Sequence, residues 1–263
     1  MPIIPSRLCS LTRWATRPLI LALAISTGAP LSPTTREATT LYAQIPFDGE
    51  VRQLVTFRLL PGRSGDAMQL YAEQAVPLYE AGNAMRSFRG LREVESPIPL
   101  DLIVVSSFAG MGGMDDSNAE LRGLAANAGT SIGAIYGAIG ALSSSHDDHF
   151  VTMLPDLGSG DPTAARLVAL VWYQTLAGEQ EQFERSLKEV VEWEAENGVR
   201  ASTGRFLVSD GWTHLRFLGF ESLADYQSYW NSVSGAGPHG YLDGLTAQRR
   251  EVILAPVPEL TVR

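Results

Sequence analysis

Val55-Thr56-Phe57-Arg58-Leu59-Leu60-Pro61-Gly62 leads into a helical stretch that ends at Glu80-Ala81-Gly82. The same order of features returns as Val171-Trp172-Tyr173-Gln174-Thr175-Leu176-Ala177-Gly178, with a helical stretch that ends at Asn197-Gly198. The offset from Gly62 to Gly178 equals the offset from Gly82 to Gly198, so strand, turn and helix lengths agree. A weaker match, by pattern alone, relates Phe150-Val151-Thr152-Met153-Leu154-Pro155 to Val252-Ile253-Leu254-Ala255-Pro256. We interpret the chain as a tandem duplication of one α+β unit.

The first repeat predicts the order βαββαβ. Residues 51–60 alternate between apolar and polar positions, as in a half-buried strand. Ser64-Gly65-Asp66 begins a helix that ends at Gly82, and Pro77 is expected to kink or interrupt it. One face of this helix carries Met68, Tyr71, Ala72, Ala75 and Tyr79. The later predicted elements are strands 88–95 and 102–108, joined through Pro97-Ile98-Pro99, a Gly110-Met111-Gly112-Gly113 turn, an Ala/Gly-rich helical region over 115–142, and a strand that starts at Phe150.

The second repeat gives the same order with stronger signals. Its helix has a predicted apolar stripe and an acidic outer face. The stripe consists of Phe183, Leu187, Val190, Val191 and Ala195, and the outer face includes Glu181, Glu192 and Glu196. The other predicted elements are strand 167–175, a hairpin of 205–209 and 213–220 around Asp210-Gly211, a helix that opens with 223–230, and a last strand over 252–255. The turn residues and alternation favour the hairpin.

The predicted fold is therefore α+β, with two tandem ferredoxin-like βαββαβ units. Each unit has helices on one face of its sheet and leaves the other face apolar and uncovered. We expect the two units to pair sheet to sheet, with their sheets face to face, as an intramolecular α/β barrel. The predicted division is residues 1–43 as a signal peptide and low-complexity tail, 44–160 as the first repeat and 161–263 as the second.

The N-terminus has the three parts of an export signal. Arg7, Arg13 and Arg17 precede the apolar run 19–25, and small residues follow over 26–29. This run is shorter than the roughly 20 apolar residues of a membrane span, so the pattern predicts a cleaved secretory signal over an uncleaved anchor. We expect an exported protein, periplasmic or secreted, with no stable membrane span after cleavage. Cleavage is placed at Ser26 or Gly28, or after Ala43.

Composition narrows the chemistry. The chain has 263 residues, a net charge of −9 and one cysteine, Cys9, which lies ahead of the apolar run. Cleavage would leave no thiol, so a disulfide, a thiolate metal site and a cysteine nucleophile are excluded from the mature chain. The acidic balance argues against a nucleic-acid partner. Because the barrel pairing is intramolecular, we expect a monomer.

Four stretches resemble the NIPSNAP-type members of the dimeric α/β-barrel superfamily. They are Arg58-Leu59-Leu60-Pro61-Gly62, Pro77-Leu78-Tyr79-Glu80-Ala81-Gly82, His214-Leu215-Arg216-Phe217-Leu218-Gly219-Phe220-Glu221-Ser222-Leu223-Ala224-Asp225 and Ile253-Leu254-Ala255-Pro256-Val257-Pro258. The resemblance implies a paired ferredoxin-like fold. It implies no single activity, because that superfamily includes cofactor-free monooxygenases, haem enzymes, isomerases and stress proteins. The Ala/Gly-rich segment 119–141 departs from the usual short second helix.

One candidate ligand pocket follows from strand alternation. His214 and Arg216 share a face of one predicted strand, and Trp172 and Gln174 share a face of its neighbour. If these faces coincide, an aromatic wall and three polar groups line a small-molecule pocket. The alternative is that nearby acids satisfy His214 and Arg216 and that the strand is partly exposed.

Other polar motifs are assigned to loops. In His146-Asp147-Asp148-His149, alternation allows only His146 with Asp148, or Asp147 with His149, on one side, so we predict a solvated loop and no metal site. The Gly110-Met111-Gly112-Gly113 turn is followed by Asp115 and Asp116, which would repel a phosphate. His239 lies in a predicted loop over 235–241, and a place at a pocket mouth is the alternative for it.

The sequence favours binding of a small, partly apolar molecule, with no cofactor, and it names no reaction. One alternative is a cofactor-independent oxidase or monooxygenase in which Trp172 shapes the site and His214 acts as a base. Another is a structural or interaction protein without a pocket.

Overall fold

The computed structural model describes residues 49–95, 101–234 and 239–262. The predicted signal peptide, the tail that follows it, the Pro97-Ile98-Pro99 connection and most of the predicted 235–241 loop lie outside the described residues. Within the described residues, no helix is both long enough and apolar enough to cross a membrane.

The first half of the fold carries four strands. They are β1 (Val51–Leu59), β2 (Met85–Glu95), β3 (Leu102–Phe108) and β4 (Ser143–Met153). Between β1 and β2 lie α2 (Ser64–Leu70), the π-helical turn η1 (Tyr71–Ala75) and α3 (Val76–Ala81). Between β3 and β4 lie α4 (Gly110–Asn127) and α5 (Ile132–Gly140). The predicted Gly110-Met111-Gly112-Gly113 turn is wrong, because these residues form the first turn of α4.

The second half follows after two short 3-10 turns, η2 (Pro155–Leu157) and η3 (Pro162–Ala164). Its strands are β5 (Leu167–Thr175), β6 (Arg200–Val208), β7 (His214–Phe220) and β8 (Thr246–Val262). Its helices are α6 (Gln180–Glu196), α7 (Leu223–Val233) and α8 (His239–Asp243), so His239 begins a helix. The predicted hairpin is confirmed between β6 and β7, where Gly211 has a φ of 92° that favours glycine.

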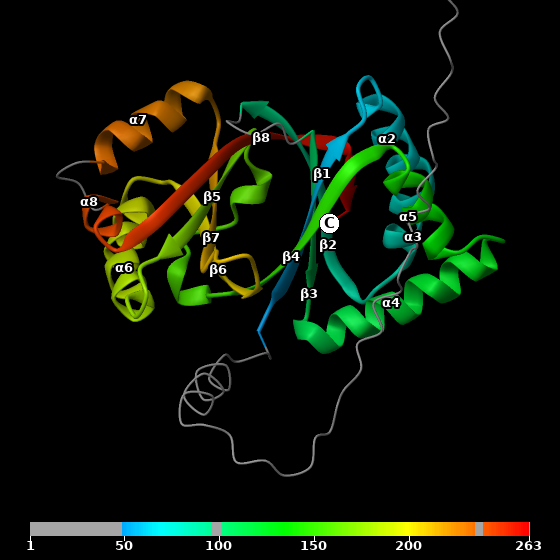
Figure 1. The fold of residues 1–263 in the computed structure, drawn as a ribbon, viewed down its shortest axis with the longest axis horizontal. Coiled ribbons are helices and arrows are strands. Elements are labelled where there is room, and N and C mark those ends of the chain that lie inside the picture. The colour runs from blue at the N-terminus through cyan, green and yellow to red at the C-terminus, as the bar shows by residue number, and fades with distance from the viewer. Residues whose placement is uncertain (1–48, 96–100, 235–238, 263) are drawn as a thin grey trace, which may run out of the picture. The chain divides into compact units, whose positions relative to one another are not determined.

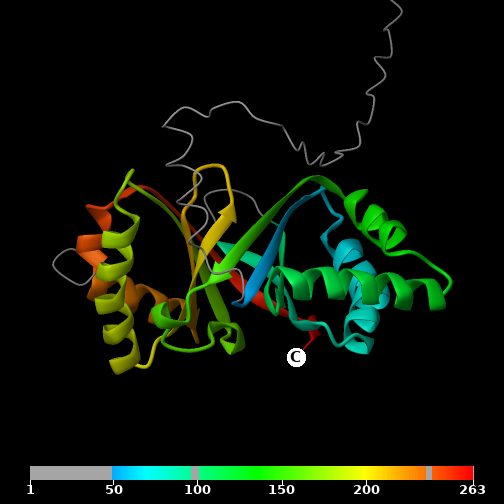
Figure 2. The ribbon, with the colours of Figure 1, turned by 90° about the horizontal axis from the view of Figure 1, so that it is seen from below.

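The eight strands form one closed antiparallel barrel in the order β1-β3-β2-β8-β5-β7-β6-β4. The two halves join at both edges, where β2 pairs with β8 and β4 pairs with β6. The predicted α/β barrel is confirmed as a closed barrel, in which the apolar sheet faces line the inside. The prediction did not include the backbone hydrogen bonds that join the two sheets at their edges. Figures 1 and 2 show the strands in the middle, with α2–α5 on one side and α6–α8 on the other.

Three apolar cores follow from this arrangement. The inside of the barrel is filled by side chains from both halves, such as Leu54, Ile103, Leu170 and Leu254. A second core lies between the strands of the first half and helices α2–α5. The third lies between the strands of the second half and helices α6–α8. Alternate residues of each strand thus point into the barrel or toward helices.

The predicted break at Pro77 is confirmed. The helix changes to a π turn over Tyr71–Ala75, and Pro77 occupies the first turn of α3. Proline has no backbone N–H and cannot continue an α-helical ladder, so a wider turn precedes it. This turn brings Tyr71 and Tyr79 to the same side of the helical segment, where both contact Phe88.

The α6 stripe is confirmed except at its end. Phe183, Leu187, Val190 and Val191 are buried, and the three predicted outer acids are exposed. Glu194 and Ala195 exchange the expected roles, because Glu194 is 0% exposed and Ala195 is exposed. A buried carboxylate needs partners, and Glu194 has them in the second half of the sheet.

Candidate functional site

A cavity of about 270 Å³ lies between the strands of the first half and helices α3–α5, on the outside of the barrel. We call it the tyrosine cavity, because Tyr71, Tyr79 and Tyr136 line it. Strands β1 and β3 contribute the alternate residues that face the helices, including Val55, Phe57, Val104, Ser106 and Phe108. The cavity is thus formed by the strand faces opposite to those that fill the barrel.

Aromatic rings make up much of its wall. The Phe88 ring stacks on Tyr71 with centroids 5.9 Å apart and lies 4.6 Å from the Tyr79 ring. Phe57 meets Tyr71 edge to face at 6.1 Å. Met85 and Met114 also line the cavity, and thioethers adapt to ligands of irregular shape. These side chains define a site for a flat apolar body.

Two tyrosine hydroxyls meet in the cavity. The hydroxyl oxygens of Tyr79 and Tyr136 are 2.8 Å apart and share a hydrogen bond. Burial raises the pKa of both Tyr71 and Tyr79, and the nearby Tyr136 raises both pKa values further. These phenols are therefore protonated at neutral pH, so each can donate a hydrogen bond.

Tyr71 is a third phenol of the tyrosine cavity, and the residue is only 4% exposed. A phenol hydroxyl can donate and accept a hydrogen bond. Because Tyr71 lines the cavity, its hydroxyl is a polar group that a ligand can use.

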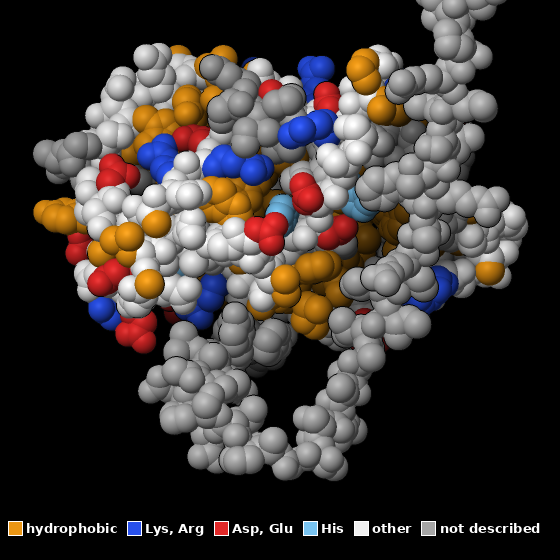
Figure 3. Space-filling model, in the orientation of Figure 1, with side chains coloured by type: hydrophobic (Ala, Val, Ile, Leu, Met, Phe, Trp, Pro, Cys, Tyr) orange, Lys and Arg blue, Asp and Glu red, His pale blue; other side chains and the backbone are white. Residues whose placement is uncertain are grey.

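His146 and Asp148 stand at the β4 side of the tyrosine cavity. The His146 Nε2 atom lies 3.8 Å from Asp148 Oδ2, and Gln53 donates a hydrogen bond of 2.9 Å to Asp148 Oδ1. The His146 ring stacks on Phe57 at 5.9 Å. Both side chains are about half exposed, so solvent reaches them. Figure 3 shows histidine and acidic side chains gathered in the middle of one face of the molecule, with hydrophobic side chains beside them.

This placement corrects the predicted loop over His146-Asp147-Asp148-His149. These residues belong to strand β4, which begins earlier than expected and pairs with β1 along its length. The alternation argument holds, because His146 and Asp148 line the tyrosine cavity, whereas Asp147 and His149 are absent from its lining. Within the described part of the chain, no group of three His, Cys, Asp or Glu side chains can hold a metal ion.

The four residues predicted to share a pocket lie on opposite faces of the sheet. Trp172 is opposite Leu215 in the β5–β7 register, and both fill the barrel. His214 is opposite Tyr173 and Arg216 is opposite Val171, so both polar side chains face helix α6. The predicted pocket is therefore wrong. His214 and Arg216 pair with Tyr173 and Val171, which are the neighbours of Trp172, and a shift of one residue along a strand places a side chain on the opposite face of the sheet.

Arg216 belongs to a buried ion pair. Its NH2 group donates a hydrogen bond of 2.6 Å to Glu194, and both side chains are 0% exposed. Tyr229 donates to the other Glu194 oxygen at 2.6 Å, and the Arg216 Nε atom donates to Thr203 at 3.2 Å. The alternative is therefore confirmed in that an acid pairs with Arg216, although the NH1 group of Arg216 is buried without a hydrogen-bond partner among the described residues. The expected partial exposure of the strand is wrong, because every residue of β7 is buried.

His214 is likewise held by an acid. Its Nε2 atom is 2.9 Å from Glu184 on α6, and Arg205 pairs with the same carboxylate oxygen. Burial is the largest effect on the imidazole and lowers its pKa, although Glu184 opposes the shift. His214 and Trp172 lie on opposite faces of the sheet, so the predicted role of His214 as a base in a site shaped by Trp172 is corrected.

Trp172 and Gln174 occupy the barrel side. The Arg250 guanidinium lies over the Trp172 ring, 4.5 Å from its centroid. The Gln174 side chain packs against Gly211, where a Cβ atom would be 3.2 Å from the amide nitrogen. Both residues therefore have contacts within the fold.

Sequence reasoning missed the tyrosine cavity because its residues resemble core residues. Tyr71 and Tyr79 were part of the predicted apolar helix face, and Tyr136 lies in the Ala/Gly-rich segment. The sequence contained one signal for this cavity, which was the three tyrosines on the helical segments predicted to cover the first sheet. A buried phenol usually needs a hydrogen-bond partner, so several of them on one side indicate a polar site within a core.

No protein-family model and no curated protein sequence matches this chain. Solved structures match its fold. A proposed monooxygenase from Fusobacterium nucleatum is 8% identical, with 80% of this chain and 93% of that chain covered and a TM-score of 0.60. An anthrone oxidase-like protein is 9% identical over 80% and 92% of the two chains, with a TM-score of 0.54.

A mutant chlorite dismutase from Candidatus Nitrospira defluvii gives 9% identity over 81% and 92%, also with a TM-score of 0.54. At such identities the likeness concerns fold alone. This chain has the α+β barrel fold of the dimeric α/β-barrel proteins.

Proposed function

We propose that this protein binds a small aromatic molecule with at least one hydrogen-bonding group in the tyrosine cavity. The observation that carries the proposal is the ring-lined cavity, to which Tyr71, Tyr79 and Tyr136 contribute phenol groups. An apolar pocket with a few directed polar groups is the usual form of a small-molecule site. This cavity argues against the alternative of a structural or interaction protein without a pocket.

The cavity also limits the size and polarity of the ligand. Its volume of about 270 Å³ is slightly below the ~300 Å³ at which typical ligand pockets begin. The wall offers stacking surfaces from Phe57 and Phe88, and protonated phenols as donors. A flat phenol, quinone or related carbonyl compound of two or three rings fits this combination.

Binding of 2-naphthol, measured by isothermal titration calorimetry, tests the proposal. Tyr71→Phe keeps the ring and removes the hydroxyl, so we expect the loss of one hydrogen bond, about 0.5–1.5 kcal/mol or roughly a two- to twelvefold increase in Kd. Ser106→Phe places a ring inside the cavity and should abolish binding.

Tyr241→Phe is the matched control, because Tyr241 is 68% exposed and lies outside the cavity. This control should bind 2-naphthol as tightly as the unmodified chain. The proposal is wrong if Ser106→Phe, folded by circular dichroism, binds 2-naphthol with unchanged affinity.

A cofactor-independent oxidase or monooxygenase is the second candidate, supported by His146 beside Asp148 at the cavity. An imidazole next to a carboxylate can accept a proton from an activated CH2 group of a bound substrate. In the overall reaction, the CH2 group and O2 give a carbonyl group and one water molecule. The solved structures of similar fold include proteins named as a proposed monooxygenase and an anthrone oxidase-like protein.

Oxygen uptake with anthrone as substrate tests this second candidate. We expect His146→Gln to lower the rate by about 10²–10⁴-fold, the usual contribution of a general base. His149→Gln is the control, because His149 is absent from the cavity lining. No uptake by the unmodified protein would eliminate catalysis on anthrone while leaving the binding proposal intact.

We also propose that the two halves are a tandem repeat of NIPSNAP-like type, and that the exported chain is a monomer. The support is the repeated strand and helix order, together with a barrel that closes through β2–β8 and β4–β6 within one chain. Light scattering of the purified protein should give the mass of one chain, and N-terminal sequencing of exported protein should start after Ser26, Gly28 or Ala43.

A further inference from the structure

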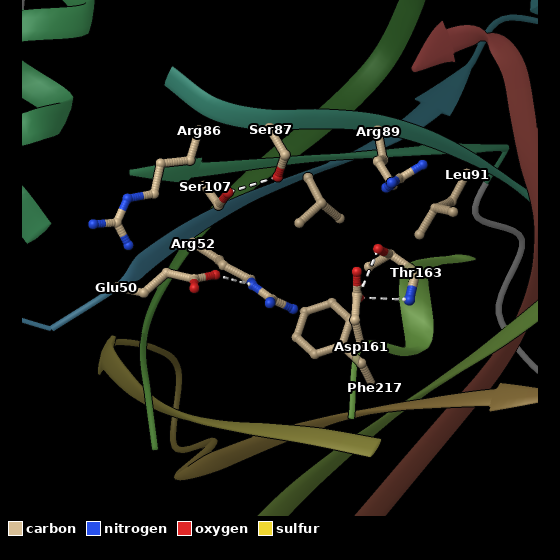
Figure 4. Close-up of a pocket in the computed structure, with 11 residues that line it drawn as sticks. Glu50, Arg52, Arg86, Ser87, Arg89, Leu91, Ser107, Asp161, Thr163 and Phe217 are labelled. Carbon is tan, nitrogen blue, oxygen red and sulfur yellow. Dashed lines mark hydrogen bonds and ion pairs between the residues drawn. The ribbon is translucent and has the colours of Figure 1, made fainter. Parts of the chain in front are cut away.

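A second cavity, of about 350 Å³, is lined by charged side chains, among them Arg52 and Asp161. Figure 4 shows that both of these groups have partners within the fold. Arg52 donates a hydrogen bond of 2.7 Å to Glu50. Thr163 donates to Asp161 through its backbone N–H at 2.9 Å and through its hydroxyl at 2.7 Å. The charges of Arg52 and Asp161 are thus satisfied within the fold.

The tyrosine cavity has a different character, because its polar groups are mainly uncharged. The described residues that line it include no arginine and no lysine, and their one carboxylate belongs to Asp148. A negative charge on a ligand would be repelled by Asp148, with no arginine or lysine in this lining to offset the repulsion. We therefore expect a neutral ligand in the tyrosine cavity.

The pair of hydroxyls from Tyr79 and Tyr136 is the polar centre of this cavity. Tyr79 on α3 is 4% exposed, whereas Tyr136 on α5 is 40% exposed. Their oxygens are 2.8 Å apart, so the Tyr136 hydroxyl reaches from the rim of the cavity to a buried partner. Two hydroxyls that share one hydrogen bond use one of their two protons in it. The other proton is free for a further acceptor.

The free proton is assigned to Tyr136. The more buried hydroxyl, that of Tyr79, has less access to water, and it is satisfied as a donor when it donates to Tyr136. Burial raises the pKa of both phenols, and the shared hydrogen bond adds to the rise at Tyr79 and opposes it at Tyr136, as expected if Tyr79 donates. A hydroxyl that accepts a hydrogen bond donates its own proton more strongly, because hydrogen bonds in a chain polarise one another.

We propose that Tyr136 selects the ligand of the tyrosine cavity by donating a hydrogen bond to the carbonyl oxygen of a neutral aromatic ketone or quinone, while Tyr79 positions and polarises Tyr136. This proposal rests on the binding function proposed above and names the class of ligand. A ketone oxygen is a stronger acceptor than a phenol oxygen, whose lone pair is delocalised into its ring, and it brings no additional proton that needs an acceptor. The Ala/Gly-rich segment 119–141 then has a role, because it carries Tyr136 to the cavity.

Calorimetry with 1-tetralone and tetralin tests the class of ligand. The two molecules have the same pair of fused rings, and only 1-tetralone has a carbonyl group. We expect 1-tetralone to bind roughly two- to twelvefold more tightly, which corresponds to one net hydrogen bond. The anion 1-naphthoate should bind more weakly than 1-tetralone, because Asp148 repels it. Equal affinity for 1-tetralone and tetralin, or tighter binding of 1-naphthoate, would overturn the proposal.

Tyrosine variants test the roles of the two phenols. Tyr136→Phe keeps the ring and removes the donor, so it should raise the Kd of 1-tetralone to that of tetralin. Tyr79→Phe should have a smaller effect, because it removes only the polarisation. The double variant should match Tyr136→Phe, since Tyr79 acts through Tyr136, and additive losses would overturn that positioning role. Tyr241→Phe, at an exposed position outside the cavity, is the matched control and should leave the Kd unchanged.

Infrared spectroscopy of bound 1-tetralone gives a readout that a change of packing alone would not reproduce. A hydrogen bond to a carbonyl oxygen lowers its stretching frequency. We expect a lowered frequency in the unmodified chain and a return toward the value in an apolar solvent in Tyr136→Phe. The same frequency in both proteins would overturn the role of Tyr136.

The binding function and this inference can fail separately. If neither 2-naphthol nor 1-tetralone binds to the unmodified chain, both are wrong. If 2-naphthol binds while Tyr136→Phe leaves the Kd of 1-tetralone unchanged, the binding function stands and the proposed role of Tyr136 is wrong.

Discussion

The helix-covered sides of the two halves differ in what lies between strands and helices. In the first half, this space holds the tyrosine cavity, lined by rings and phenols. In the second half, the Arg216–Glu194 pair, Tyr229 and His214 lie under α6 and α7, all at most 3% exposed. One sheet pattern therefore supports either an open apolar site or a buried polar network. The two sides differ in their side chains, with Tyr71 and Tyr79 in the first half and Arg216 and Glu194 in the second.

Breaking the buried pair should give the largest effect. Glu194→Ala leaves the Arg216 guanidinium buried without its carboxylate, which costs about 3–5 kcal/mol. Urea unfolding followed by circular dichroism measures the loss. Glu192→Ala, on the exposed face of the same helix, should stay within about 0.5 kcal/mol. Similar small losses for both variants would show that the polar network does not hold the second half together.

Leucine truncation compares the two helix cores. Leu187 is 0% exposed in the filled half, so Leu187→Ala should cost about 2–5 kcal/mol. Leu121 lines the tyrosine cavity and already lacks packing partners on that side, so Leu121→Ala should cost less than Leu187→Ala. The two losses are measured by the same urea unfolding, and the reverse order would contradict the description of the first half as open.

A larger side chain should change the free energy of unfolding in opposite directions in the two halves. Ser106→Val fills part of the tyrosine cavity and should stabilise the chain by about 0.5–2 kcal/mol. Ala169→Val enters a space where the original residue is 0% exposed, and overpacking typically costs about 1–3 kcal/mol. Thermal melts of both variants measure the change, and destabilisation by both would mean that the cavity collapses around its side chains.

The pH dependence of stability is expected to show a smaller effect. Burial lowers the pKa of His214 below its ordinary value of 6.5, so the unfolded chain binds more protons once the pH falls below that value. The stability that neutral His214 provides is complete above pH 6.5 and is lost as the pH falls toward the lowered pKa. One group changes stability by at most about 1.4 kcal/mol per pH unit.

Melts across this range should show a weaker pH dependence for His214→Gln than for the unmodified chain. His149 adds to the same trend in both proteins, because its pKa is also lowered by burial. His146→Gln is the control, since His146 is about half exposed. Identical pH profiles for His214→Gln and the unmodified chain would remove His214 as the cause.

The repeated glycines, Gly62 with Gly178 and Gly82 with Gly198, predicted the first strand, turn and helix of each half, and alternation and turn residues predicted the later elements. They did not predict edge pairing, because the alternation along β2 and β8 specifies which face is apolar and does not specify what lies beside each edge. The amphipathic stripe placed α6 correctly up to Val191. It failed at Glu194, whose burial depends on Arg216 from a distant strand.

The candidate site was less predictable than the fold. His214 and Arg216 were singled out as a polar pair on one strand, yet each is held by an acid of α6 that lies 30 or 22 residues earlier in the chain. The tyrosine cavity depends on the π turn before Pro77 and on the position of Tyr136, and hydrophobic periodicity contains no information on either. Hydrophobic patterns in a sequence predict which residues are buried. They do not predict a cavity, because a cavity depends on how the buried side chains pack in three dimensions.

Strand β8 links the two halves of the barrel, because its first part pairs with β5 and its last part pairs with β2. Residues 246–254 pair with β5, and residues 253–262 pair with β2, so one strand belongs to both halves. Gly90 on β2 lets Leu260 cross it closely, because a Cβ atom there would be 2.5 Å from the Leu260 Cβ. A chain that lost the last part of β8 would expose β2 as an unpaired edge. Free edges recruit strands from other molecules, so the end of β8 protects this barrel against aggregation.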